Sequence, residues 1–333
     1  RGVFKPMTRP FLPALPITIL SQNADAIRTA LHTAMKKNSC LKAGPEVVIR
    51  QATDTPSQIN CDAVEVMIAD PDLAAQIIPD CTNLTWYQST WAGNAPLLNG
   101  GKTDYTLTAL RGVFGPLMRE YVFAYLLQHA RNLDGFAEQQ AATPPRWESA
   151  TRMPLRGQTL GIIGVGDIGK ALMPVAQSFG MTVIGVSRSG NAVKGVERMY
   201  ATAELHQFAQ QADHVVNLMP DTPGTYGLLN EDFFACLKPH SIFINAGRGN
   251  AVDDEGLLSS LDKHHLAHAV LDVFTQEPLP SSHPFWRHPK VTVTAHTAAE
   301  SRPADVASVF LDNATRFAHG DTLLYQCDFA KGY

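Results

Sequence analysis

The sequence predicts an α/β protein with two domains, each built on a parallel sheet that helices cover. Three observations indicate this fold. The 333 residues are about twice the length of a typical domain. Short apolar segments alternate with helical patterns along most of the chain. Two adjacent prolines, Pro144 and Pro145, interrupt that alternation and indicate an extended connector, because proline fixes its own φ and disfavours helix in the residue before it.

Short apolar segments in the first third of the chain are predicted to be strands of a parallel sheet. The strands are expected at residues 17–20, 46–49, 64–69, 84–89 and 106–110, and helical patterns lie between some of them, at 23–35 and 72–78. This alternation is typical of βα units. Pro116 then opens a helical pattern over residues 117–132, which is long enough to bridge two domains.

A second series of strands follows the proline-rich connector. Six strands are predicted, at residues 159–164, 182–187, 214–218, 241–246, 268–273 and 291–295. Helical patterns at 168–179 and 254–261 supply crossovers, so the six strands make a doubly wound set. The helical segment 301–319 then packs back on the first domain. We therefore expect a discontinuous first domain, residues 1–100 plus 298–333, and a second domain at residues 101–297.

Composition and charge argue against several classes of protein. Hydrophobic residues make up 45% of the chain and charged residues 17%, which predicts a globular protein. The net charge of −4 gives no basic field for nucleic acid, and no segment has the ~18 apolar residues of a membrane span. Five scattered cysteines without a C-x-x-C pair fit reduced thiols in a cytoplasmic protein. The residues before Met7 receive no functional role.

Three closely spaced histidines, His264, His265 and His268, have a spacing that suits a metal ion. They lie at a predicted helix-to-strand junction, with neither a cysteine nor an acidic cluster beside them. We therefore predict no metal site.

A glycine-rich turn follows the first strand of the second series. Its first glycine permits a tight turn, its second lets the backbone approach a pyrophosphate, and its third lets helix and strand pack closely. In this strand, turn and helix context we predict a Rossmann-like domain that binds a dinucleotide. A ligand-free turn is the alternative. The predicted cofactor contacts are Gly164, Gly166, Asp167, Ile168 and Gly169.

The next strand ends in Ser187, Arg188 and Ser189, where an NAD-specific site carries an acidic residue. A carboxylate would repel a 2′-phosphate, whereas a guanidinium and two hydroxyls can bind one. These residues therefore predict that NADP(H) is preferred and that NAD(H) remains possible. A solvated surface arginine is the alternative.

Three reactive side chains follow successive strands of the second series. They are Arg248, Glu277 and His296. The carboxyl ends of parallel strands meet at one edge of a sheet, where ligands bind. An arginine can bind a carboxylate, and a histidine held by a carboxylate can deliver a proton to a carbonyl oxygen. We predict these three residues to be catalytic; a surface charge, a loop charge and a strand-end cap are the structural alternatives.

Several motifs occur in an order that is more specific than any one of them. The resemblance that they carry runs from about Val64 to the C-terminus, and the chain resembles the D-isomer-specific 2-hydroxyacid dehydrogenase family. Within it, the chain is most similar to bacterial glyoxylate/hydroxypyruvate reductases of the A type. We expect two doubly wound domains, Rossmann-like or flavodoxin-like, with an active-site cleft between them. The motifs lie at residues 86–93, 111–115, 159–164, 219–223, 245–249, 271–280 and 330–333.

The resemblance implies a division of labour. Arg248 would bind the substrate carboxylate and carbonyl, Glu277 would support the histidine, and His296 would be the acid/base. Asp272 would approach the nicotinamide carboxamide, and a homodimer would form through residues 117–132. Backbone amides around Trp91, Ala92 and Gly93 would bind the substrate carboxylate. Further implied cofactor contacts are Met219, Pro220, Thr225, Ala246 and Gly247.

The resulting hypothesis is reduction of a small 2-oxo acid, glyoxylate or hydroxypyruvate, to the D-2-hydroxy acid. The alternatives are another 2-hydroxy acid, phosphite, or a dinucleotide-sensing protein without catalysis, similar to corepressors. Glu277 argues against formate dehydrogenase activity, because that group carries glutamine there. The chain has Asn94 and Ala95 where the family commonly has Val-Asp, which predicts a weaker cap on the next helix.

Overall fold

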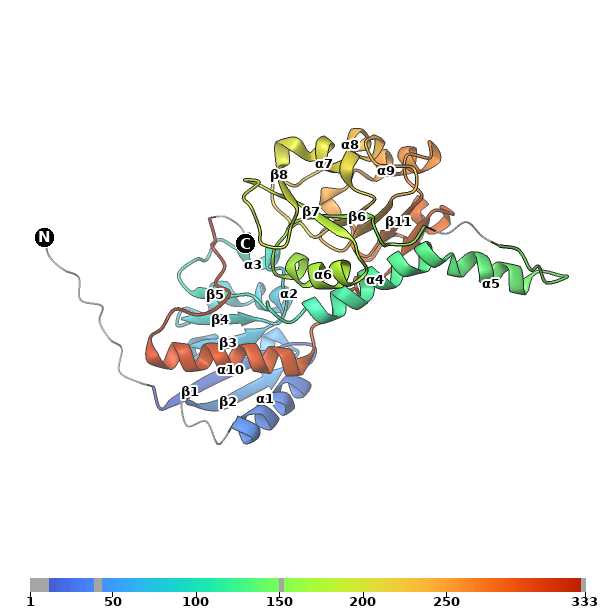
Figure 1. Ribbon diagram of the computed structural model, residues 1–333. Coiled ribbons are helices and arrows are strands. Elements are labelled where there is room, and N and C mark those ends of the chain that lie inside the picture. Colours follow the sequence, from blue (N-terminus) through green and yellow to red (C-terminus); the bar gives the residue numbers. More distant parts are fainter. Residues whose placement is uncertain (1–11, 39–43, 150–152, 331–333) are drawn as a thin grey trace, which may run out of the picture. The chain divides into compact units, whose positions relative to one another are not determined.

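The computed structural model describes residues 12–38, 44–149 and 153–330, and the chain separates into two units (Figure 1). Unit 1 comprises residues 1–113 and 301–333, and unit 2 comprises residues 114–300. The predicted divisions after residues 100 and 297 therefore differ from those of the structure. The reason for the first difference is that residues 106–108 form a strand that pairs with the first sheet. The end of the 330–333 motif, the residues before Met7 and Cys40 lie outside the described residues.

Unit 1 contains a five-stranded parallel sheet of order β2-β1-β3-β4-β5. This is the order of a flavodoxin-like doubly wound sheet, so the predicted fold class is confirmed. Its strands are β1 (Ala14–Leu20), β2 (Glu46–Thr53), β3 (Val66–Ala69), β4 (Trp86–Ser89) and β5 (Thr106–Thr108). Its helices are α1 (Ala24–Asn38), α2 (Pro71–Ala74), α3 (Ala95–Leu98) and α10 (Pro303–His319), with 3₁₀ turns at Pro56–Gln58, Cys61–Ala63 and Ile78–Asp80.

The C-terminal helix α10 belongs to the core of unit 1, where it lies beside α1 (Figure 1). Its apolar face is buried, and Phe310 stacks on Trp86 of β4 with a centroid distance of 4.9 Å. The helix begins at Pro303, which needs no backbone donor there, and ends before Gly320 at a φ of 72°. The chain thus returns to its first sheet after completing the second.

Unit 2 contains a seven-stranded parallel sheet of order β12-β11-β10-β9-β6-β7-β8. Its middle strands are buried along their whole length, as expected of a parallel sheet covered on both faces. The strands are β6 (Thr159–Ile163), β7 (Thr182–Ser187), β8 (Arg198–Ala201), β9 (His214–Asn217), β10 (Ile242–Asn245), β11 (His268–Leu271) and β12 (Val291–Val293). The helices are α4 (Gly115–Arg131), α5 (Leu133–Ala141), α6 (Asp167–Ser178), α7 (Leu205–Gln211), α8 (Glu231–Ala235) and α9 (Asp254–Asp262), and 3₁₀ turns occur at Thr202–Glu204, Gly249–Ala251 and Pro284–Arg287.

The sequence predictions about unit 2 omitted one strand and one helix. The six-strand set lacked β8, which is a short edge strand with a charged residue at its start and weak apolar character. The helix predicted over 117–132 is confirmed as α4, but the second helix that follows it, α5, was not predicted; Asn132 adopts a left-handed conformation with φ 51° between the two. Helix α4 lies wholly in unit 2.

Among the described residues, no helix is both long and apolar enough to cross a membrane. The described part of the chain also contains no group of three or more His, Cys, Asp or Glu side chains arranged to hold a metal ion.

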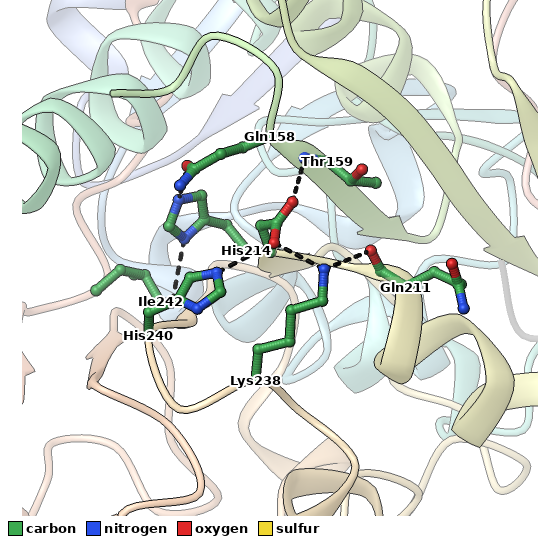
Figure 2. A network of polar contacts seen from close by, with 8 residues as sticks. Gln158, Thr159, Gln211, His214, Lys238, His240 and Ile242 are labelled. Carbon is green, nitrogen blue, oxygen red and sulfur yellow. Dashed lines mark hydrogen bonds and ion pairs between the residues drawn. The ribbon is translucent and has the colours of Figure 1, made fainter. Parts of the chain in front are cut away.

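A polar network joins three strands of unit 2 at their amino ends (Figure 2). His214, at the start of β9, is only 2% exposed. Its Nε2 lies 2.7 Å from Gln158 Oε1, and its Nδ1 accepts a hydrogen bond from the Ile242 amide. These two partners fit a neutral imidazole that donates from Nε2.

Asp213, the residue before His214, completes the network by accepting from the neighbouring strand, from a lysine and from a second histidine. It accepts from the Thr159 amide at 2.7 Å, from Lys238 Nζ at 2.7 Å and from His240 Nε2 at 3.0 Å (Figure 2). Burial, helped by the charge of His129 and opposed by that of Asp213, lowers the pKa of His214 to about 4. The network therefore keeps a neutral histidine between the strands.

This burial predicts an acid-sensitive stability. The unfolded chain binds a proton at His214 near pH 6.5, whereas the folded chain excludes it down to about pH 4, so the unfolded state binds more protons between these values. Stability is expected to fall as pH drops through that window, by up to about 3 kcal/mol. Urea unfolding at pH 7.5, 6 and 5 measures it. His214→Gln should flatten the dependence, and exposed His206→Gln should not; equal slopes in all three proteins would contradict the assignment.

Candidate active site

The glycine turn joins β6 to α6 at the carboxyl edge of the unit 2 sheet. Gly164 has a φ of +93°, and a Cβ there would lie 3.0 Å from the carbonyl carbon of Leu218. A Cβ at Gly169 would lie 2.9 Å from the Gly164 oxygen. Both positions therefore require glycine for the tight turn and for close packing.

The middle glycine of the turn has a different reason to lack a side chain. Gly166 precedes the first residue of α6, and a Cβ built on it would meet nothing within 4 Å. Open space beside the N-terminus of a 12-residue helix suits a phosphate group, because the positive end of the helix dipole points there. Asp167 and Ile168 form the first turn of that helix. The turn therefore fits a dinucleotide pyrophosphate.

Strand β7 ends beside this turn with the residues expected to read the cofactor ribose. The Gly164 amide donates to the Val186 carbonyl at 3.0 Å, which holds the two segments together. Ser187 Oγ accepts from the Gly190 amide and shapes the loop. Arg188 and Ser189 are exposed. The loop thus presents a cation and a hydroxyl to solvent next to the glycine turn.

Two buried asparagines organise the central loops, and the sequence analysis missed both. Asn217 ends β9, Asn245 ends β10, and Asn217 Nδ2 donates to Asn245 Oδ1 at 2.9 Å. Asn217 Oδ1 also accepts from the Met219 amide. Asn245 Nδ2 donates to the Arg248 carbonyl at 3.2 Å. The sequence could have indicated them, because each is a polar residue at the end of a predicted buried strand. A buried polar side chain needs hydrogen-bond partners.

Arg248 lies between two glycines that allow close packing of the backbone. A Cβ at Gly247 would approach Met219 to 2.8 Å, and one at Gly249 would lie 1.9 Å from the Phe274 carbonyl carbon. The second contact presses the Arg248 loop against the loop that carries Glu277. Burial lowers the pKa of Arg248, while the Glu277 carboxylate opposes the shift. The guanidinium is thus partly desolvated and near an acid.

Glu277 and His296 form a direct pair. His296 Nδ1 lies 2.7 Å from Glu277 Oε2, and Glu277 Oε1 accepts from the Phe274 amide at 2.9 Å. The hydrogen bond with Glu277 raises the pKa of His296. Partial burial alone would raise the pKa of Glu277, but its bonds with His296 and Phe274 outweigh burial and lower it. The pair therefore favours an imidazolium whose Nε2 is turned away from the carboxylate.

Asp272 holds the backbone that carries His296. Its side chain is buried, and Oδ1 accepts from the Thr297 amide at 2.8 Å and from the Thr294 hydroxyl at 2.5 Å. Oδ2 accepts from the Ala298 amide at 3.0 Å. His296 itself has a φ of 55°, a conformation that non-glycine residues rarely adopt. The carboxylate therefore stabilises the turn in which His296 sits.

The loop after β4 in unit 1 carries the residues predicted to bind substrate. The Trp91 amide donates to Ser89 Oγ at 3.0 Å, and the Trp91 carbonyl accepts from the Leu110 amide. Within the described chain, no hydrogen bond engages the amides of Ala92 and Gly93. The next helix, α3, begins at Ala95, and its N-cap residue Asn94 makes no side-chain cap, in line with the weaker cap that the sequence predicted.

The structure thus brings Arg248, Asp272, Glu277 and His296 to the carboxyl edge of one sheet, beside the glycine turn. The residues Trp91, Ala92 and Gly93 belong to the other unit. Met219, Pro220, Thr225, Ala246 and Gly247 lie in the two loops that the buried asparagines organise.

A parallel sheet with a glycine turn at its first strand and an Arg, Glu and His set at its later strand ends defines a class: the dinucleotide-dependent oxidoreductases. The family model described as "D-isomer specific 2-hydroxyacid dehydrogenase, NAD binding domain" matches residues 123–298. The chain belongs to the D-isomer-specific 2-hydroxyacid dehydrogenase family.

Relatives and solved structures agree with this membership. Glyoxylate/hydroxypyruvate reductase A of Serratia proteamaculans is 35% identical over 65% of this chain and 68% of its own. A family member from Aeromonas salmonicida has a TM-score of 0.84 and 38% identity, over 94% of this chain and 99% of its own. One from Xanthobacter autotrophicus, in complex with NADPH, has a TM-score of 0.81 and 28% identity, over 96% and 99%. The NADPH-dependent glyoxylate/hydroxypyruvate reductase of Sinorhizobium meliloti, in complex with NADP, has a TM-score of 0.78 and 29% identity, over 96% and 99%.

Removing the Glu277 charge should lower the pKa of His296. The carboxylate stabilises the imidazolium, so the neutral amide of Glu277→Gln removes that stabilisation. An NMR titration of the His296 ring measures the change directly. Glu300→Gln is the matched control, because it deletes a carboxylate near in sequence but outside this pair. An unchanged His296 titration in Glu277→Gln would contradict the pairing.

Proposed function

We propose that this protein reduces a small 2-oxo acid, with glyoxylate and hydroxypyruvate as the candidates, to the D-2-hydroxy acid. The pair of Glu277 and His296 beside the partly buried Arg248 is the observation that carries this proposal. The set supplies a cation for a carboxylate and a protonated imidazole for a carbonyl oxygen. The names of the similar reductases from Serratia and Sinorhizobium support this choice of substrate.

Each side chain has a separate role in the proposed reaction. Arg248 binds the substrate carboxylate and polarises the neighbouring carbonyl, because its guanidinium offers a rigid fork of donors. His296 delivers a proton from Nε2 to the carbonyl oxygen. Glu277 stays ionised on Nδ1 and holds the charged form of the ring. Asp272 keeps the turn of His296 in place, and the family resemblance also assigns it to the nicotinamide carboxamide.

The cofactor would be held by the glycine turn and by the loops at the ends of β7, β9 and β10. We assign the pyrophosphate to the glycine turn and the first turn of α6, at Gly166, Asp167 and Ile168, and the 2′-phosphate of NADP(H) to Arg188 and its flanking serines. The bound nicotinamide supplies the hydride for the carbonyl carbon. NAD(H) use remains compatible with this loop. The cofactors named in the related Xanthobacter and Sinorhizobium structures support NADP(H).

We assign the substrate carboxylate also to the amides of Ala92 and Gly93. The Trp91 amide already donates to Ser89 Oγ, so it is a poorer donor for a ligand than the two that follow it. The Trp91 side chain is 39% exposed, so it is not core packing alone, and its bulk favours a small substrate. In this proposal unit 1 contributes contacts to the substrate, and unit 2 binds the dinucleotide and supplies Arg248, Glu277 and His296.

The proposed assembly is a homodimer through the region of α4 and α5. Leu133 in α5 is 53% exposed and Trp147 beyond it is fully exposed, which supports a partner surface there. A cytoplasmic location rests on the scattered cysteines of the sequence. A sensing role without catalysis is the second candidate function, but the complete Arg248, Glu277 and His296 set favours an enzyme.

His296→Asn tests the catalytic assignment. Loss of a general acid is expected to lower kcat for glyoxylate and hydroxypyruvate reduction by about 10²- to 10⁴-fold. Asparagine also tolerates a left-handed backbone, so the fold should persist. Steady-state NADPH oxidation measures the loss, and His283→Asn, at the residue before the 3₁₀ turn Pro284–Arg287, serves as the control. Wild-type activity in His296→Asn would exclude the proposed mechanism.

Arg188→Ala tests the reading of cofactor preference. The wild type is expected to favour NADPH over NADH. The variant should raise KM for NADPH by about 10- to 100-fold, because it loses one to two charge-assisted hydrogen bonds to the 2′-phosphate. KM for NADH should change little. Arg198→Ala is the control, because this exposed arginine stacks on Tyr200 and pairs with Glu204 instead. A wild type that favours NADH would overturn the role of Arg188 while leaving the chemistry intact.

A further inference from the structure

Two cysteines in unit 1 lie side by side at the amino ends of β3 and β4. Cys61 begins the 3₁₀ turn Cys61–Ala63, and Cys81 follows the 3₁₀ turn Ile78–Asp80. Both side chains belong to the same apolar cluster of unit 1. Cys61 Sγ lies 3.8 Å from the Ile77 carbonyl, directly beside the turn that leads to Cys81.

The pairing of the two strands explains why these cysteines meet. In the β3/β4 ladder, Val66 pairs with Trp86, and each further pair keeps the same separation in sequence. Cys61 and Cys81 stand at that separation too, just before the ladder begins. The Asn83 side chain donates to the Asp62 carbonyl at 2.7 Å, which keeps the two leading segments together. Neighbouring strands lie about 4.8 Å apart, within the range of backbone separations that a disulfide spans.

The two thiols differ in exposure, as a reactive cysteine and its partner do. Cys61 is partly exposed, whereas Cys81 is fully buried. Burial and, after it, the neighbouring Cys61 thiol raise the pKa of Cys81 to about 12. An oxidant from solvent therefore reaches Cys61 first, and Cys81 is protected from direct attack.

We propose that Cys61 and Cys81 form a reversible redox modification site, at which a peroxide converts the two thiols to a disulfide. The Cys61 thiolate attacks one peroxide oxygen, the O–O bond breaks, and a sulfenic acid and water form. The Cys81 sulfur then attacks the Cys61 sulfur, the S–O bond breaks, and the Cys81 proton leaves with the hydroxide as water. The thiols lose two electrons and the peroxide is reduced to two waters.

The cross-link would join the segments that lead into β3 and β4. It closes the chain between positions 61 and 81, so it restricts the unfolded state and raises the thermal unfolding temperature of the oxidised protein. A thiol reductant reverses the change. This site is independent of the proposed reduction of 2-oxo acids, since neither thiol is among the residues assigned to that reaction.

The site is tested by treating the reduced full chain with one equivalent of hydrogen peroxide. Free thiols should fall from five to three per chain, with a mass loss of about 2 Da. Between Arg50 and Lys102 the sequence has neither lysine nor arginine, and Glu65 separates the two cysteines. Trypsin followed by cleavage after glutamate should therefore yield peptides 51–65 and 66–102 joined by a disulfide. The unfolding temperature should rise and return to its first value with reductant.

Matched variants make the result specific. Cys61→Ser should keep its four thiols and show no shift in unfolding temperature, and its exposed position makes the substitution safe for folding. Cys236→Ser is the control, because Cys236 is also partly exposed but lies in unit 2, and it should form the joined peptide as the wild type does. A disulfide between two chains, sulfinic acid at Cys61 without a joined peptide, or loss of two thiols in Cys61→Ser would each overturn the proposal.

Discussion

Buried polar side chains at the ends of parallel strands are the interaction on which the candidate site depends. Asn217, Asn245 and Asp272 each end a strand or follow it directly, and each binds backbone groups of the adjoining loops. Because these side chains are almost fully buried, a lost partner would leave a costly unpaired group, which keeps each loop in one conformation. The exposed pair of Glu277 and His296 is therefore supported by a rigid, desolvated layer beneath it.

Hydrogen bonding of buried polar side chains also distinguishes the two ends of the unit 2 sheet. The amino end holds a satisfied network around the neutral His214, whose partners leave it little chemistry to perform. The carboxyl end holds an imidazole and a guanidinium with capacity to bind further groups. Both ends are rich in polar side chains, so it is the unused hydrogen-bonding capacity that distinguishes the candidate site.

Much of this arrangement could be predicted from the sequence, because strand ends in a parallel sheet converge. That rule placed Arg248, Glu277 and His296 together, and the structure shows the Glu277 and His296 contact. Strand β8 was not predicted, because an edge strand needs no strong apolar pattern. Helix α5 was not predicted, because a single left-handed residue, Asn132, separates it from α4. The role of Asp272 in the turn depends on a backbone angle that no residue pattern shows.

The left-handed backbone at His296 limits which residues this position can accept. Glycine, asparagine and aspartate enter that conformation at low cost, whereas β-branched residues would distort the turn that Asp272 holds. Variation here is thus restricted twice, by the chemistry of the ring and by the geometry of the main chain. A designer who seeks an inactive but correctly folded form, for trapping a bound substrate in a crystal, would begin from that short set of residues.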